Sequence, residues 1–143
     1  MKDIEIEILK PDKFAILELP FYECSIEAGF PSPAEDYLDK CLDLNRELIH
    51  NPSSTFFGRV RGNSMIDAGI FDGDMLVIDK SLSPKHNSTL VCFLDGEFTV
   101  KKVAYIDDQL YLMPQNPKFK PIKVSDESDF RIWGVVVYSI HKH

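Results

Sequence analysis

The hydrophobic pattern of the chain changes character at about residue 51. From there to the C-terminus, short apolar or alternating segments are separated by turn-forming Gly, Pro, Asn and Asp residues, which is typical of β-strands. Asp95-Gly96 stands between two such segments and favours a two-residue hairpin turn. The pattern predicts strands in the segments 55–62, 74–79, 89–94, 97–103, 110–114, 119–124 and 130–140. The last segment is apolar on both faces, so we expect it to be a central strand.

The first fifty residues follow a different pattern. Residues 3–9, DIEIEIL, alternate acidic and apolar positions, so they either pair with a sheet edge or form a solvated tail. The segment 1–28 as a whole is expected to be weakly structured. A helix is predicted over residues 32–49, because Ser32 begins a capping box and Asn51-Pro52 ends the helical pattern. The early part of that segment could equally be extended.

Charge and cysteine usage narrow the class of protein. The 143 residues carry a formal net charge of -7, and clustered Lys and Arg are what a phosphate backbone requires, so we expect no direct nucleic-acid binding. Residues 1–28 contain three lysines against seven acidic residues and form an acidic arm. Cys24, Cys41 and Cys92 show no paired spacing, and the apolar run 133–140 is too short to span a membrane. We therefore expect a cytoplasmic protein without a membrane segment.

The segment richest in chemistry is RVRGNSMIDAGIFDGDMLVID, residues 59–79. Ser64 follows Gly62-Asn63, and glycine near a serine allows a sharp turn that presents the hydroxyl and backbone N–H groups to an oxyanion. A serine needs a base before it can act as a nucleophile, and none of the four histidines is well placed by its local pattern. Asp72–Asp74 offers too few ligands for a calcium loop, so we expect a turn there, with no metal and no cofactor.

A buried lysine is an alternative base. The ordinary pKa of lysine is about 10.4, and burial lowers it because the charged form is disfavoured. Lys101 and Lys102 both lie in the apolar strand segment 97–103. Adjacent strand residues face opposite sides of a sheet, so only one of the two can point toward Ser64. The alternation of side chains does not decide which one.

Several motifs together resemble a known family. The serine segment, GEFTVKKV, GFPSPAEDY and WGVVV resemble the LexA/UmuD family of self-cleaving Ser–Lys peptidases, and the UmuD branch in particular, over residues 26–137. The resemblance implies a mostly β fold: a LexA/signal-peptidase-like curved sheet with a flexible N-terminal arm and one short helix. One departure is Asn63, where the UmuD pattern has an acidic residue.

The resemblance also implies roles for individual residues. Ser64 is then the nucleophile and Lys101 the general base, while Met65 lines the pocket or supports the oxyanion through its N–H. Cleavage of the chain itself is expected between Ala28 and Gly29. The implied organisation is an arm over residues 1–28 that self-cleavage removes, a linker and short helix over 29–50, and a Ser–Lys peptidase domain over 51–143.

The family further implies partners and a pathway. A RecA filament on single-stranded DNA promotes the cut after DNA damage, as part of the SOS response. The trimmed product forms a homodimer and joins UmuC in an error-prone translesion polymerase, which the uncut form restrains.

Three other readings of the sequence remain. The chain could be a non-catalytic interaction module that keeps the fold. It could be a LexA-like or phage-type repressor, but the 28 residues before Gly29 are acidic and too few for a helix-turn-helix domain. It could be a membrane-anchored signal peptidase, which the absence of a long apolar segment argues against.

Overall fold

The computed structural model describes residues 4–10, 18–22, 39–63, 65–113, 115–118, 120–125 and 129–143. The chain divides into two compact units, a first unit of residues 1–12 and 51–143 and a second unit of residues 13–50. The elements in chain order are β1 (Ile4–Leu9), β2 (Glu18–Tyr22), β3 (Asp39–Asp43), α1 (Leu44–Leu48), η1 (Pro52–Ser54), β4 (Thr55–Gly62), η2 (Ile66–Ala68), β5 (Met75–Asp79), β6 (Thr89–Leu94), β7 (Glu97–Ile106), β8 (Gln109–Met113), β9 (Ile122–Lys123) and β10 (Phe130–Ile140).

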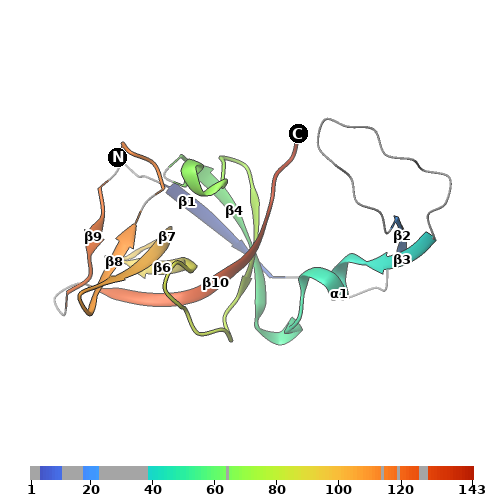
Figure 1. The fold of residues 1–143 in the computed structure, drawn as a ribbon, viewed down its shortest axis with the longest axis horizontal. Helices are drawn as coiled ribbons and strands as arrows, with labels where there is room; N and C mark the ends of the chain where they lie inside the picture. Colours follow the sequence, from blue (N-terminus) through green and yellow to red (C-terminus); the bar gives the residue numbers. More distant parts are fainter. Residues whose placement is uncertain are drawn as a thin grey trace. The chain divides into compact units, whose positions relative to one another are not determined.

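The first unit is built on one antiparallel sheet of eight strands, in the order β1-β4-β5-β10-β6-β7-β8-β9. Its strands curl strongly, so that β1 at one edge also contacts β7, five places away in that order (Figure 1). β10 pairs with β5 on one side and β6 on the other, which confirms that the most apolar segment is a central strand. The predicted mostly β, curved-sheet fold is therefore correct.

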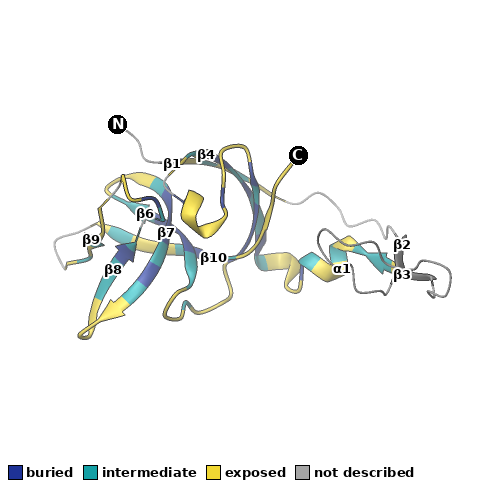
Figure 2. Ribbon diagram, turned by 45° about the horizontal axis from the view of Figure 1, so that its top comes forward, coloured by how far each residue is buried: buried dark blue, intermediate teal, exposed yellow. Residues whose placement is uncertain are grey.

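The apolar side chains of this sheet gather into two clusters. The first contains Val60, Met65, Ile70, Leu76, Ile78, Val91 and Val100, and the second contains Leu90, Cys92, Val103 and Leu112. Strands β5, β6 and β7 supply buried residues to them, and dark blue is visible beside the labels of β6 and β7 in Figure 2. On β6, Val91 belongs to the first cluster and its neighbours Leu90 and Cys92 to the second, as expected when successive strand side chains alternate between the faces of a sheet.

The predicted hairpin is present. β6 and β7 are joined by Asp95 and Gly96, whose φ angles of 49° and 86° are both positive. A type I′ turn requires such angles at both central positions, and its twist matches that of the flanking strands. The Asp-Gly pair thereby fixes the register of β7 against β6, and with it the position of every side chain on β7.

The helix prediction was wrong for part of its length. Residues 39–43 form β3, which pairs antiparallel with β2, and only Leu44–Leu48 is α-helical. Asp43 caps this short helix by accepting a hydrogen bond from the Asn45 N–H at 3.0 Å. A nearby strand partner, invisible to a local pattern, outweighs the helical periodicity there. The predicted cap at Ser32 lies outside the described residues.

The expectation of a weakly structured arm also needs correction. Within residues 1–28, Ile4–Leu9 is β1 of the first unit and Glu18–Tyr22 is β2 of the second. The alternating DIEIEIL segment thus pairs with a sheet edge, which was one of its two predicted states. No helix in the described part of the chain is both long and apolar enough to cross a membrane.

Gly58 in β4 lets β1 pack closely. A Cβ atom added at Gly58 would lie 2.5 Å from Ile6 Cδ1, 2.9 Å from Ile6 Cγ1 and 3.0 Å from Ile78 Cδ1. Ile8 of β1 is the residue paired with Gly58 in the register, and Ile6 and Ile8 both pack against the first cluster. Only glycine leaves room for this arrangement.

We predict that Gly58→Ala destabilises the protein by about 1–3 kcal/mol, because overpacking forces neighbouring side chains to move. Urea unfolding measures the loss. Ile6→Ala alone also costs stability, but it removes the two closest atoms. The double variant Gly58→Ala, Ile6→Ala should therefore lose less than the sum of the two single variants. Strictly additive losses would show that Ile6 and Gly58 are not in contact.

Candidate active site

Lys101 occupies the middle of β7 and is buried. Its position in the register is opposite Leu90 of β6, and its exposed fraction is only 1%. Three nearby residues of β7, namely Thr99, Val100 and Val103, are buried as well. A lysine ordinarily keeps its ammonium group in water, so a fully enclosed one is unusual. The strand places this amine inside the domain rather than on its surface.

The surroundings of Lys101 change its protonation. Burial lowers its pKa from the ordinary 10.5 to about 8, because desolvation disfavours the charged ammonium more than the neutral amine. A group with a pKa near 8 is neutral in a useful fraction of molecules near neutral pH, and a neutral amine can accept a proton. Lys102, the other candidate base, is only partly buried. Because adjacent residues of β7 face opposite sides of the sheet, Lys101 is enclosed while Lys102 is only partly buried.

Ser64 lies outside the described residues, but the residues on both sides of it are described. β4 ends at Gly62, which has a φ angle of 111°, and η2 begins directly after Met65. The Gly62 N–H donates to Asp72 Oδ1 at 2.9 Å, and the Met65 carbonyl accepts from the Ala68 and Ile70 N–H groups, each at 3.1 Å. Hydrogen bonds from within the predicted serine segment thus hold the residues on both sides of position 64.

A second loop braces this turn. Asn116 is buried, and its Nδ2 donates to the Asn63 carbonyl at 2.8 Å, while its Oδ1 accepts from the Lys118 N–H at 3.1 Å. The Asp67 N–H donates to the Gln115 carbonyl at 2.6 Å. The loop that contains Gln115 and Asn116 is therefore hydrogen-bonded both to Asn63, which precedes Ser64, and to η2, which follows Met65. The sequence predicted no role for Asn116; its only local signal is the turn-forming dipeptide Asn116-Pro117.

Met65 connects the serine segment with the lysine strand. Its side chain has no exposed surface and belongs to the first cluster, together with Val100 of β7. The neighbours in sequence of Ser64 and Lys101 therefore pack in the same core cluster. The Met65 carbonyl, by contrast, is engaged by two N–H groups of its own segment. The structure thus shows Met65 as a core residue whose backbone N–H adjoins position 64.

The C-terminal end of the chain also holds the serine segment. Nδ1 of His141 is hydrogen-bonded to Oδ1 of Asp74, whose carboxylate is buried and also accepts from the Phe71 N–H at 2.9 Å. The His141 ring lies 5.1 Å from the Phe71 ring, centroid to centroid. Asp72–Asp74 is therefore a hydrogen-bonded turn that leads into β5. Its contact with His141, far along the chain, was not apparent from the sequence.

The described residues thus provide a buried amine of lowered pKa and hydrogen-bonded residues on both sides of position 64. Ala28 and Gly29, the predicted cut site, lie outside the described residues, as does Cys24. Cys41 and Cys92 are free thiols, and burial raises the pKa of Cys92 to about 12, which makes its thiolate scarce at neutral pH.

The pH dependence of stability should report the burial of Lys101. At pH 7 the folded state holds a desolvated ammonium, which costs about 3 kcal/mol. From about pH 8 to 10.5 the folded state has lost this proton while the unfolded chain still binds it, so stability rises with pH. Lys101→Met removes this cost, so the variant should have a higher free energy of unfolding than the parent chain at pH 7. When urea unfolding is repeated near pH 11, this difference should shrink by about the same amount.

Lys102→Met is the matched control for that comparison, because Lys102 is the next residue on β7 and is only partly buried. The change in relative stability between pH 7 and pH 11 should be larger for Lys101→Met than for Lys102→Met, because only Lys101 is enclosed. If the difference in free energy of unfolding between Lys101→Met and the parent chain were the same at both pH values, Lys101 would have an ordinary pKa.

Asn116→Ala should destabilise the protein by about 1–2 kcal/mol, because it removes a side chain that makes two hydrogen bonds from a buried position. Lys118→Ala is the control, since Lys118 is exposed and contributes only its backbone N–H to this loop. Thermal unfolding compares the two. Equal melting temperatures for both variants would show that Asn116 does not brace the turn.

Comparison with known proteins agrees with the fold and the motifs. The model of the peptidase S24-like family matches residues 20–137. Protein MucA of Salmonella typhimurium is 43% identical over 126 residues, which cover 87% of this chain and 86% of MucA. Protein ImpA of Escherichia coli is 40% identical over 131 residues, covering 86% of this chain and 83% of ImpA. A LexA repressor of Stenotrophomonas maltophilia is 35% identical over 120 residues, covering 84% of this chain and 56% of the repressor. The chain therefore belongs to the peptidase S24-like family, the LexA/UmuD-like serine peptidases.

Proposed function

We propose that the protein cuts its own chain between Ala28 and Gly29, with Ser64 as the nucleophile and Lys101 as the general base. The observation that carries this proposal is the burial of Lys101 on β7, with its pKa lowered to about 8. No surface role requires an enclosed lysine, whereas a serine without a histidine requires a neutral base. Membership of a serine peptidase family supports the same chemistry.

The proposed reaction has two stages. In the first, neutral Lys101 accepts the Ser64 hydroxyl proton while the serine oxygen attacks the Ala28 carbonyl carbon. The resulting oxyanion accepts hydrogen bonds from backbone N–H groups near Ser64, among them that of Met65. The C–N bond then breaks, and protonated Lys101 gives its proton to the leaving amine of Gly29.

In the second stage, water attacks the ester between Ala28 and Ser64, and Lys101 again accepts the proton. The ester bond breaks, Ser64 regains its hydroxyl proton from Lys101, and Ala28 ends in a carboxylate. The substrate is the protein's own chain, so each molecule reacts once. The products are the arm, residues 1–28, and a trimmed chain of residues 29–143 that holds the linker 29–50 and the peptidase domain 51–143.

The biological setting follows from the family. We propose a cytoplasmic SOS mutagenesis protein, whose cut a RecA filament on single-stranded DNA stimulates and whose trimmed homodimer joins UmuC in a translesion polymerase. MucA and ImpA, which the chain matches over most of their own length, support the UmuD-like assignment. The net charge of -7 supports action through protein partners rather than by direct contact with DNA.

The test is the intact mass of the purified chain over time, at about pH 7 and about pH 10. Loss of residues 1–28 should be about tenfold faster at the higher pH, because a base with a pKa of about 8 is about one-tenth neutral at pH 7. Ser64→Ala and Lys101→Ala should abolish the loss, whereas Lys102→Ala should cleave at the parent rate.

RecA, ATP and single-stranded DNA should accelerate the same cut at pH 7. Cleavage that persists in Ser64→Ala would refute the nucleophile. A chain that stays whole in every condition would favour the second candidate, a non-catalytic interaction protein that has kept the fold. An increase of several hundredfold between the two pH values would mean that Lys101 has an ordinary pKa.

A further inference from the structure

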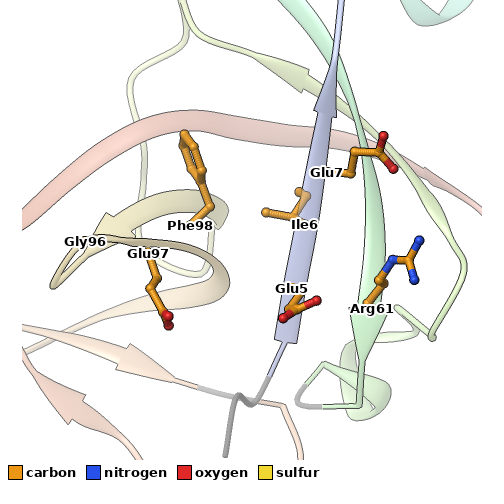
Figure 3. Close-up of a pocket in the computed structure, with 7 residues that line it drawn as sticks. All are labelled: Glu5, Ile6, Glu7, Arg61, Gly96, Glu97 and Phe98. Carbon is orange, nitrogen blue, oxygen red and sulfur yellow. The ribbon is translucent and has the colours of Figure 1, made fainter.

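β1 lies in a slot between two strands that are far apart in the sheet. Among the described strands it is hydrogen-bonded only to β4, and all six of its residues are paired there, from Ile4 opposite Gly62 to Leu9 opposite Phe57. Its other edge faces β7, which it contacts without pairing. A cavity of about 430 Å³ remains on that side, lined by Glu5, Ile6, Glu7, Arg61, Gly96, Glu97 and Phe98 (Figure 3).

One face of β1 binds the slot through apolar contacts. Ile6 and Ile8 pack against the first cluster, and Gly58 of β4 leaves the space that Ile6 Cδ1 fills. Removing β1 would uncover this apolar surface and leave the backbone N–H and C=O groups along one edge of β4 without partners. An uncovered apolar edge of this kind binds another strand readily.

The other face of β1 is matched to the slot by charge. Glu5 lies opposite Arg61 in the register, and Glu7 lies opposite Arg59. Opposite charges directly across an antiparallel pair are stabilising, and like charges are destabilising. Among the residues that line the cavity, Glu97 stands on the β7 side, and Arg61 supplies positive charge from β4. The slot therefore favours a strand in which β-branched apolar residues alternate with acidic ones.

We propose that the slot between β4 and β7 is a strand-docking site for a partner segment of this alternating apolar and acidic chemistry, and that β1 fills it in the uncut chain. This inference rests on the proposed function, because cleavage at Ala28-Gly29 places β1 on the released arm. In the intact chain β1 is tethered beside the slot at a high effective concentration; after the cut it binds as a separate peptide and can be displaced. The partner then adds a strand to β4 by β-augmentation.

The test uses the full chain with Ser64→Ala, which blocks self-cleavage, and a site-specific protease sequence inserted between Ala28 and Gly29. A fluorescent peptide of residues 1–12 is added before and after that protease cuts, without removing the arm, so the slot is never left empty. Fluorescence anisotropy should show the peptide exchanging into the cut chain and not into the uncut chain. Because Ser64 takes no part, failure of the proposed self-cleavage does not affect this result.

Charge reversal provides the matched control. A peptide with Glu5→Lys and Glu7→Lys should bind the cut chain at least ~10-fold more weakly. It should regain affinity on a cut chain with Arg59→Glu and Arg61→Glu, which restores opposite charges at both positions. Circular dichroism of that chain verifies its fold. Equal binding to cut and uncut chains, no exchange into the cut chain, or equal binding of both peptides to the parent slot would each overturn the proposal.

Discussion

A lysine enclosed by strands must either lose its proton or keep a desolvated charge that destabilises the fold. The structure around β7 imposes this choice on Lys101. The Asp95-Gly96 turn sets the register of β7 against β6. In that register Lys101 is enclosed, with an exposed fraction of 1%. The same burial that lowers stability near neutral pH supplies a base that can act there. The burial of Lys101 thus lowers the stability of the folded state, at the position where the proposed chemistry needs a neutral amine.

The sequence predicted most of the sheet because its signals are local. The Asp-Gly hairpin and the apolar run of β10 each depend on residues close in the chain, and both were correctly assigned. The helix before residue 50 was wrong over Asp39–Asp43, where pairing with β2 decides the structure. Alternation could not choose between Lys101 and Lys102, since it shows that they face opposite sides but not which side is enclosed.

The contacts that brace the serine turn could not have been predicted at all. Asn116 reaches the Asn63 carbonyl, and His141 reaches Asp74, over separations of 53 and 67 residues. Only the completed fold brings such pairs together. β1 shows the same principle, because its acidic and apolar alternation indicated a strand, while the arginines and the glycine that receive it are more than fifty residues away on β4.

The central claim is that Lys101 is neutral in a substantial fraction of folded molecules near neutral pH. Its pKa can be measured directly by following the side-chain carbon resonances of Lys101 by NMR in the full Ser64→Ala chain, which stays whole, with Lys101→Met to assign the signal. The structure predicts an apparent pKa of about 8, well below the ordinary 10.5 of a lysine side chain. A value near 10.5 would contradict the account, because a fully protonated lysine cannot take the proton of a serine.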